Sequence, residues 1–339
     1  MSKKVLFYSS VKDKNLFNTQ FFYKTDINLL KSLGYNVITS NKISDFLFFW
    51  KYDIAFIYFY KYGLFVAIIA RLFLKKVFFT GGIDDLEKEF ATPKRFLLQV
   101  LFFRLCYLFS NKCIVVSNSD KNNILKIYKR KKLKKLEYSF HSIDVDKYFN
   151  KIETLQQNNF VTIAWMGKKS NVIRKGIDRS IRLFKNITEK YDIFKNSNLI
   201  IVGEKGEGSH YLEELVEKLD ISDKVLFTGE IDENEKISLL KESKYYFQLS
   251  SYEGFGIAAL EALAAGNIVI HSGKGGLADS VSKYGVLINI NDEISKQAED
   301  VFEQINSFKY NKLEEAKIYI SHNFSMEKRL KDFRLIIDS

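Results

Sequence analysis

Apolar positions in the first 150 residues form short continuous runs that alternate with longer stretches of helical spacing. The short runs occupy residues 4–9, 36–39, 53–59, 76–80 and 112–116. Residues 18–33, 64–74 and 96–109 carry apolar side chains at the spacing of a helix, and Gly34 stands where a helix C-cap residue is expected. This alternation predicts a parallel sheet covered by helices on both faces.

The same alternation restarts after a polar stretch at residues 151–159, which we predict to be a linker. Strands are predicted at 160–165, 198–202, 224–228, 245–249 and 268–271, and helices at 177–190, 211–219 and 254–265. The expected domains are residues 1–155 and 156–320, followed by a C-terminal segment at 321–339. Two stacked α/β domains of this doubly wound kind place a ligand cleft at the carboxyl ends of their strands.

Composition narrows the class of protein. The chain has 339 residues, of which 46% are hydrophobic and 27% charged, as in soluble globular domains. Its net charge of +11 suits an anionic partner, but no zinc-finger spacing or RNA-recognition motif is present, so nucleic acid is not an expected partner. The two cysteines, Cys106 and Cys113, lack metal-ligand spacing and favour a reduced, cytoplasmic protein. Arg71 and Arg104 interrupt the longest apolar stretches, and the N-terminus does not resemble a signal peptide.

The most informative segment is YEGFGIAALEALAAG at residues 252–266. Glu253 is predicted at a strand end, and Glu261 follows eight residues later inside a helix. Glycines between them let backbone amides approach a ligand, where the helix N-terminus adds partial positive charge. Glu253 is then suited to sugar hydroxyls and Glu261 to ribose hydroxyls. The alternative is a surface helix with two solvated glutamates.

This segment resembles the family 4 glycosyltransferases of the GT-B fold. Further resemblance lies in GKKSNVIRKGID at 167–178, LIIVGEKGEG at 199–208, VLFTGEI at 225–231 and the tail HNFSMEKRLKDF at 322–333. The resemblance implies two Rossmann-like domains facing across a cleft, with the C-terminal helix packing back toward the first domain. It also implies a retaining, metal-independent transfer of a sugar from a nucleotide-sugar, by default a UDP-sugar, with no cofactor. Bacterial cell-surface polysaccharide, O-antigen or capsule synthesis is the expected setting.

Carried over to this sequence, the family pattern assigns donor-binding roles. Glu253 contacts the donor sugar, Glu261 binds the ribose, and Lys175 neutralises the diphosphate, whose charge grows as the glycosidic bond breaks. Lys168 and Arg174 are alternatives for a second cation, on a loop predicted to be longer than in most relatives. The alternative for all three cations is a solvated loop in a lysine-rich protein. The further donor-side residues are Gly167, Gly203, Gly229, Phe255, Gly256 and Ile257, of which Gly203 and Gly229 are also candidates for tight turns.

The acceptor side is predicted at the carboxyl end of the strand at 76–80. Gly81 and Gly82 follow this strand, and Asp84 or Asp85 is a candidate for orienting or deprotonating the acceptor hydroxyl. The alternative is an N-cap aspartate of the next helix. The segment SFHSID at 139–144 resembles the family's Asn-Gly-Ile/Val-Asp segment before the linker, with His141 and Ser142 at the Asn-Gly positions. His141 is a candidate for lining the cleft, with a structural role as the alternative.

Aromatic and basic residues are interleaved in the first half, in FLFFW at 46–50, YFYKYG at 58–63, RLFLKK at 71–76 and KRKKLKK at 129–135. This pattern suggests peripheral attachment to the inner face of a bacterial membrane, with a saccharide or lipid-linked saccharide as acceptor. Ordinary core helices with a lysine-rich surface are the alternative. The competing functions are a nucleotide-sugar epimerase on the same scaffold and a non-catalytic nucleotide-sugar-binding protein.

Overall fold

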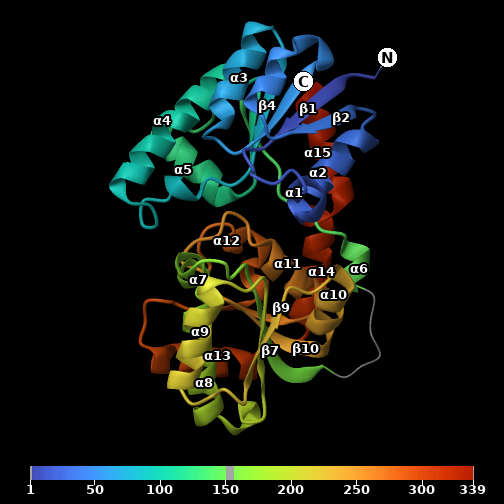
Figure 1. Cartoon of the computed structure of the whole chain (residues 1–339). Coiled ribbons are helices and arrows are strands. Elements are labelled where there is room, and N and C mark those ends of the chain that lie inside the picture. The colour runs from blue at the N-terminus through green and yellow to red at the C-terminus, as the bar shows by residue number, and fades with distance from the viewer. Residues whose placement is uncertain (1, 150–155, 339) are drawn as a thin grey trace. The chain divides into compact units, whose positions relative to one another are not determined.

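The structure is a computed structural model that describes residues 2–149 and 156–338. The chain divides into two compact units, the first made of Met1–Ile143 with His322–Ser339 and the second of Asp144–Ser321. Figure 1 labels the elements of each unit. Residues 151–155 of the predicted linker lie outside the described residues. The linker prediction is wrong for residues 157–159, which begin a strand that pairs in the second sheet.

A six-stranded parallel sheet forms the centre of the first unit, in the order β2-β1-β3-β4-β5-β6. Its strands are β1 (Lys4–Tyr8), β2 (Asn36–Ser40), β3 (Ile54–Tyr58), β4 (Lys76–Thr80), β5 (Lys112–Val115) and β6 (Leu136–Tyr138). Its helices are α1 (Leu16–Thr19), α2 (Phe21–Ser32), α3 (Gly63–Leu72), α4 (Pro93–Phe109), α5 (Asn118–Tyr128) and α15 (Met326–Asp338). The predicted helix at 18–33 is broken, because Gln20 has an extended backbone between α1 and α2.

Alternate side chains of the four central strands, β1, β3, β4 and β5, enter two different cores. Val5 and Phe7 pack with α1, α2 and α15, whereas Leu6 and Tyr8 pack with α3, α4 and α5. Figure 1 shows these two helical layers on opposite faces of the sheet. Apolar side chains on both faces of buried parallel strands explain the continuous hydrophobic runs in the sequence.

A buried ion pair fastens α15 to the first unit. The Arg329 guanidinium donates to both carboxylate oxygens of Asp26 on α2, at 2.7 Å each, and both side chains are 1% exposed. Arg329 also donates to the carbonyl oxygen of Ser139 at 2.9 Å. Opposite charges that are removed from water together need such complete pairing.

The second unit has its own six-stranded parallel sheet, in the order β12-β11-β10-β7-β8-β9. Its strands are β7 (Gln157–Ile163), β8 (Leu199–Val202), β9 (Val225–Gly229), β10 (Ser243–Gln248), β11 (Ile268–His271) and β12 (Val286–Leu287). Its helices are α6 (Val145–Phe149), α7 (Lys169–Lys175), α8 (Ile177–Lys190), α9 (Glu207–Lys218), α10 (Glu233–Glu242), α11 (Ile257–Ala265), α12 (Leu277–Ser280), α13 (Ile294–Asn306) and most of α14 (Asn311–Phe324).

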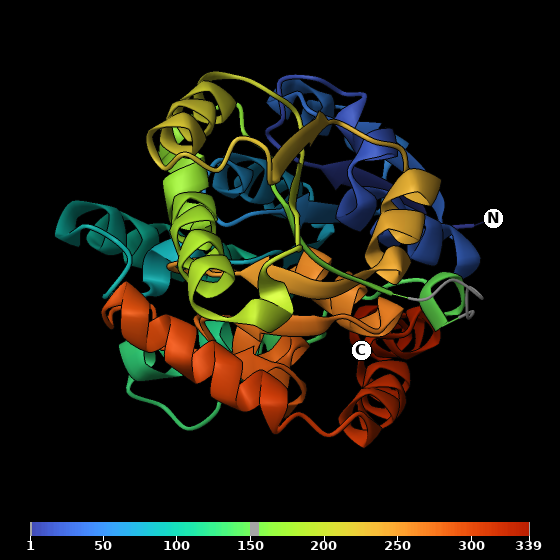
Figure 2. The ribbon, with the colours of Figure 1, turned by 90° about the horizontal axis from the view of Figure 1, so that it is seen from below.

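One apolar core runs through the second unit and joins the sheet to α8, α9 and α13. Helices α8 and α13 lie against each other, and the rings of Tyr191 and Phe302 stack between them with centroids 3.9 Å apart. Figure 2 shows the helices of this unit from below. Both units therefore have the predicted α/β architecture of a parallel sheet between helical layers. Within the described residues, no helix is long and apolar enough to cross a membrane.

Candidate functional site

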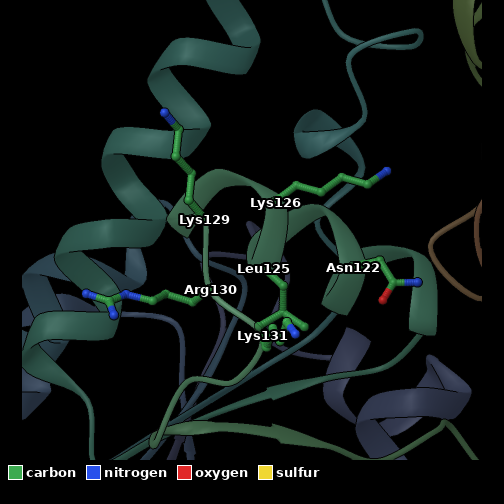
Figure 3. Close-up of a pocket in the computed structure, with 6 residues that line it drawn as sticks. All are labelled: Asn122, Leu125, Lys126, Lys129, Arg130 and Lys131. Atoms are coloured by element: carbon green, nitrogen blue, oxygen red, sulfur yellow. The ribbon is translucent and has the colours of Figure 1, made fainter.

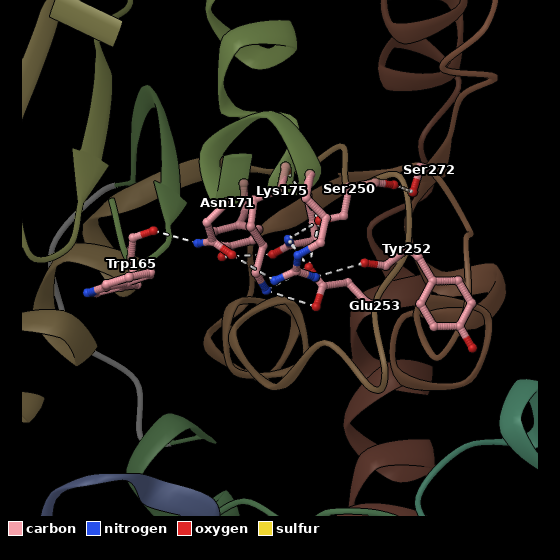
Figure 4. Close-up of polar contacts among 10 residues, drawn as sticks. Trp165, Asn171, Lys175, Ser250, Tyr252, Glu253 and Ser272 are labelled. Carbon is pink, nitrogen blue, oxygen red and sulfur yellow. Dashed lines mark hydrogen bonds and ion pairs between the residues drawn. The ribbon is translucent and has the colours of Figure 1, made fainter. Parts of the chain in front are cut away.

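Glu253 and Lys175 meet at the carboxyl end of β10. The Lys175 ammonium lies 2.7 Å from Oε1 and 2.8 Å from Oε2 of Glu253. Glu253 is buried, whereas the Lys175 side chain is partly exposed. Figure 4 shows the two side chains pointing toward each other from different segments of the chain. The glutamate and the lysine that were predicted to serve one donor are thus direct neighbours.

Two further side chains hold the Glu253 carboxylate. The Ser250 hydroxyl donates to Oε1 at 2.6 Å, and the Gln248 amide donates to the same oxygen at 3.0 Å. Gln248 also donates to the Ser250 hydroxyl at 2.8 Å. Burial works to raise the pKa of the Glu253 carboxyl, but the charges of Lys175 and Arg174 outweigh it, so the pKa lies below its ordinary value. Glu253 is therefore a fixed, ionised hydrogen-bond acceptor.

Lys175 is positioned by a short helix rather than by the predicted loop. Residues Lys169–Lys175 form α7, which ends at Gly176 in a left-handed conformation with φ of 68°. A side-chain carbon at Gly176 would lie 2.1 Å from the carbonyl oxygen of Leu249. Glycine is required here for both reasons, and it brings the end of α7 directly against the end of β10.

Arg174 lies beside this pair and Lys168 does not. The Arg174 guanidinium donates to the carbonyl oxygen of Tyr252 at 3.2 Å and to the Asn171 side chain at 3.0 Å. Asn171 in turn donates to the carbonyl oxygen of Trp165 at 2.6 Å. Lys168 is exposed and precedes α7, about 10 Å along the helix from Lys175. Of the two alternatives, the geometry favours Arg174 as the second cation.

The turn after Glu253 leads into α11. This helix begins at Ile257 and not at residue 254 as predicted, because Gly256 has φ of 88° and cannot belong to a right-handed helix. A side-chain carbon at Gly256 would lie 2.6 Å from Leu277. Phe255 is buried at this turn. The N-terminal amides of α11 are therefore presented four residues after Glu253.

A second glycine-rich segment, residues 273–276, supports the turn and was not predicted from the sequence. The Gly276 amide donates to the carbonyl oxygen of Glu253 at 2.7 Å. A side-chain carbon at Gly275 would lie 2.1 Å from that same oxygen, and one at Gly276 would lie 2.4 Å from Cα of Phe255. Three glycines in four residues directly after a buried strand were the available signal.

Glu261 is also buried, and its partners were not predicted. The Lys236 ammonium lies 2.9 Å from Oε2 of Glu261 and 3.0 Å from Glu233. The Tyr148 hydroxyl donates to Glu233 at 3.1 Å. Burial raises the pKa of the Glu261 carboxyl, and the Lys236 ammonium offsets this only in part. No sequence pattern marked Lys236, which stands in a helix four residues after Asp232.

The donor-side glycines bring two segments of the second unit close together. A side-chain carbon at Gly203 would lie 1.8 Å from the carbonyl oxygen of Ala164. One at Gly206 would lie 2.8 Å from Cα of Gly167. The Trp165 indole covers Gly167 and donates to Glu204 at 2.8 Å. Gly229 has φ of 78° with no atom near its missing side chain, as in a tight turn.

The predicted acceptor-side residues lie in the first unit at the carboxyl end of β4. Asp85 is buried and paired with Lys61 at 2.8 Å and with Arg95. The N-cap alternative is wrong, because α4 begins at Pro93 and its N-cap is Thr92. Asp84 is half-buried in a short 3-10 helix, Asp84–Leu86. Gly81, with φ of 116°, packs against the Phe59 ring, and Gly82 follows it partly exposed.

The two buried histidines are held in the neutral form. Burial, together with the charge of Arg329, keeps the pKa of His141 well below its ordinary value. Burial lowers the pKa of His271 to about 4, and neither of its ring nitrogens has a hydrogen-bond partner among the residues that the structure describes. His271 ends β11, and Ser272 separates it from the 273–276 segment. A neutral imidazole at either position is suited to positioning, not to carrying charge.

Residues 167–323 match the protein family described as Glycosyl transferases group 1. The match spans 157 of the 339 residues, most of them in the second unit. The match includes α7, the Lys175–Glu253 pair and Glu261. Among the described residues, no group of three or more histidine, cysteine, aspartate or glutamate side chains is arranged to hold a metal ion.

Several proteins of similar sequence are named as glycosyltransferases or mannosyltransferases. An uncharacterized glycosyltransferase of Methanocaldococcus jannaschii is 38% identical over 108 residues, which cover 32% of this chain and 26% of that protein. The O-antigen chain mannosyltransferase RfbU of Salmonella typhimurium is 25% identical over 81% of this chain and 78% of its own length. A GDP-mannose:cellobiosyl-diphosphopolyprenol alpha-mannosyltransferase of Xanthomonas oryzae is 26% identical over 58% of this chain and half of its own length.

Solved structures establish the fold of the glycosyltransferase. Anabaena Alr3699/HepE, in complex with UDP-glucose, superposes with a TM-score of 0.75 at 16% identity and covers 99% of this chain and 100% of its own. WaaG, a glycosyltransferase involved in lipopolysaccharide biosynthesis, superposes with a TM-score of 0.73 at 15% identity over 99% of this chain and all of its own. The predicted GT-B architecture is thereby confirmed.

Proposed function

We propose that this glycosyltransferase transfers a hexose from a nucleoside diphosphate sugar to a saccharide hydroxyl, with retention of anomeric configuration and without a metal ion. The observation that carries the proposal is the Lys175–Glu253 contact beside the N-terminus of α11. A cation, an ionised carboxylate and the first amides of helix α11 lie at one place, and they match the diphosphate, the sugar hydroxyls and the phosphate oxygens of such a donor.

In the proposed reaction, the bond between the anomeric carbon and the diphosphate oxygen breaks as the acceptor oxygen bonds to the same face of that carbon. The acceptor proton passes to the departing diphosphate. Lys175 and Arg174 stabilise the negative charge that grows on the diphosphate, and Arg174 contributes donors in a planar fork that lysine lacks. Glu253 orients the sugar through its hydroxyls, and Glu261 binds the ribose.

Glu261 requires a rearrangement to fill that role. Its Oε2 is occupied by Lys236, whose side chain is 15% exposed. A ribose hydroxyl that donates to Glu261 must therefore share the carboxylate with Lys236 or displace it. Glu253 differs, because its Oε1 accepts three hydrogen bonds, whereas its Oε2 contacts Lys175. We accordingly place the sugar hydroxyls at Oε2 of Glu253.

The acceptor side and the biological setting rest on the relatives. Two of them are named for O-antigen chain synthesis and for a diphosphopolyprenol-linked saccharide. We propose a saccharide or lipid-linked saccharide acceptor in cell-surface polysaccharide synthesis, on the cytoplasmic side of the membrane. Asp84 or Asp85 is the candidate group for orienting the acceptor hydroxyl, and the Asp85 carboxylate is held by Lys61 and Arg95.

The donor is tested by thermal shift with UDP, GDP, ADP and their sugars. A ligand that binds the native state raises its melting temperature, so the panel identifies the base and the sugar. We expect UDP- or GDP-sugars to raise the melting temperature. Glu253→Gln should reduce this rise more for the sugar nucleotide than for the free nucleotide. No shift with any diphosphate would contradict the proposal.

Transfer itself is tested with the donor so identified and saccharide acceptors in the presence of EDTA. We expect product with the anomeric configuration of the donor, read by NMR. Conversion of the donor in the absence of any acceptor would instead indicate an epimerase. Tight donor binding without any transfer across an acceptor panel would indicate a binding protein.

A further inference from the structure

The edge of the first sheet where its strands begin carries large exposed apolar side chains. Trp50 is 63% exposed, Leu72 is 75% exposed and Leu74 is 90% exposed. Trp50 precedes β3, and the other two precede β4, which is its parallel neighbour. Residues far apart in the sequence therefore share one edge, which we call the amino edge.

These side chains form a contiguous patch. The rings of Phe49 and Phe73 stack with centroids 4.4 Å apart, and the Trp50 ring lies 5.5 Å from Phe48 and 5.2 Å from Phe49. Leu72 and Leu74 flank Phe73 in the chain. We call Phe48, Phe49, Trp50, Leu72, Phe73 and Leu74 the apolar patch. A connected exposed surface of this kind marks an interaction site more often than scattered apolar residues do.

Leu74 has an unusual backbone conformation for a leucine and a highly exposed side chain. Its backbone is left-handed, with φ of 57°, directly after the end of α3. Glycine or asparagine is the usual residue at such a position, and a leucine there has a strained backbone and an almost fully exposed side chain. Neither the fold of α3 nor its packing explains a leucine at this position.

Cations surround the patch at the amino edge. The Lys51 ammonium lies over the Phe48 ring at 4.7 Å, and that of Lys75 lies over Tyr52 at 5.7 Å. Helices α3 and α4 contain arginine and lysine but no acidic residue. The basic run at 129–135 follows α5 and precedes β6, so it lies on this edge as well.

A shallow hollow of about 450 Å³ opens at the end of α5. It is lined by Asn122, Leu125, Lys126, Lys129, Arg130 and Lys131. Figure 3 shows the Lys126, Lys129 and Arg130 side chains extending in different directions instead of converging on one point. Diverging cations suit an extended anionic surface better than a single bound anion.

We propose that the amino edge of the first unit docks on an anionic lipid bilayer, with the apolar patch inserted among the headgroups and the 129–135 run held against them. Tryptophan and phenylalanine favour the membrane interface, and clustered lysines are drawn to anionic lipid. The five-residue strands span about 17 Å, so the opposite edge, with Gly81 and Asp85, faces away from the lipid. The proposal is independent of donor chemistry.

The test is flotation of the full chain with vesicles of phosphatidylcholine and phosphatidylglycerol. We expect binding to these vesicles, weak binding to phosphatidylcholine alone, and release at high salt. Since the chain has two tryptophans, Trp165→Phe leaves Trp50 as the sole reporter, and its emission should shift to the blue with anionic vesicles. An emission maximum that stays unchanged while the protein floats would overturn insertion at this patch.

Two double variants locate the surface. Leu72→Asp/Leu74→Asp should reduce flotation at least tenfold, whereas Leu226→Asp/Leu287→Asp, which alters two exposed leucines of the second unit, should not. Far-UV circular dichroism and urea denaturation that match those of the unchanged protein show that both variants are folded. The proposal fails if Leu72→Asp/Leu74→Asp still floats, or if this variant converts a dimer to a monomer. It also fails if flotation is abolished only by Leu97→Asp/Leu101→Asp on α4.

Discussion

The Lys175 ammonium contacts both carboxylate oxygens of Glu253, at 2.7 and 2.8 Å, although the two residues lie 78 positions apart in the chain. Each neutralises the charge that the other would present to a donor. A diphosphate that draws Lys175 toward itself would leave Oε2 of Glu253 for a sugar hydroxyl. The pair would then couple the binding of the two ends of the donor.

Lys175→Met should impair both stability and transfer. Loss of the ammonium leaves a buried carboxylate without its cation, which costs on the order of 3 kcal/mol, and removes a diphosphate contact worth about 100-fold or more in kcat. Urea denaturation and steady-state transfer measure the two effects. Lys190→Met, which alters an exposed pair with Glu299, is the control and should change neither. Full transfer by Lys175→Met would exclude the proposed role.

Ser250→Ala should shift the acid limb of the pH profile of kcat/KM toward higher pH. The Ser250 hydroxyl donates to Oε1 of Glu253 and helps hold the pKa of that carboxyl below its ordinary value. Without this hydrogen bond the ionised form is less favoured, so the pKa of Glu253 rises and activity is lost sooner on acidification. Activity near neutral pH should be largely retained.

The matched control is Ser307→Ala, because the Ser307 hydroxyl donates to the main-chain carbonyl oxygens of Glu303 and Gln304 at the exposed end of α13. Its acid limb should coincide with that of the unchanged protein. An acid limb that stays in place in Ser250→Ala would mean that another group, and not Glu253, sets the acidic side of the profile.

His271→Leu should reduce the loss of stability on acidification. Burial lowers the pKa of His271 to about 4, so in the range between about 4 and 6.5 the unfolded chain takes up a proton that the folded chain does not. Stability from this group is complete above pH 6.5 and falls as the pH decreases toward 4. Between pH 7 and pH 5 the loss amounts to about 2 kcal/mol.

Denaturation in urea at pH 7 and pH 5 measures that difference in the free energy of unfolding. The difference should be smaller in His271→Leu by roughly the stated amount. The pKa of His141 is also lowered, so His141 accounts for part of the pH dependence that remains in this variant. His210→Leu is the control, since that histidine is exposed beside Glu214. Equal pH dependence in His271→Leu and the unchanged protein would show that His271 titrates normally.

Arg329→Met should destabilise the first unit strongly. The substitution leaves the Asp26 carboxylate buried without a partner, which costs about 3–5 kcal/mol in comparable pairs. The double variant Asp26→Leu/Arg329→Met removes both charges and should recover much of that loss. A double-mutant cycle from urea denaturation gives the coupling, and additive effects of the two single substitutions would rule out the pair as the anchor of α15.

The local pattern of apolar residues was sufficient to predict the bounds of several buried strands and helices. The strands Lys76–Thr80 and Ile268–His271 and the helix Ile177–Lys190 begin and end where the sequence predicts, because continuous apolar runs and a single apolar helix face leave few alternatives. The strand at 157–163 was placed three residues late, since its first residues are polar. The start of α11 was misplaced because a left-handed Gly256 is indistinguishable in sequence from a helical one.

The sequence alone predicted the two α/β units and singled out the Glu253–Glu261 segment as the candidate site. Only the tertiary structure decided that Arg174, rather than Lys168, accompanies Lys175, because α7 is a helix whose ends face different surroundings. It alone revealed Lys236 on Glu261, Arg329 on Asp26, and an amino edge assembled from separate segments. Such pairings depend on which strand ends are neighbours in a sheet, and that order is a property of the whole fold.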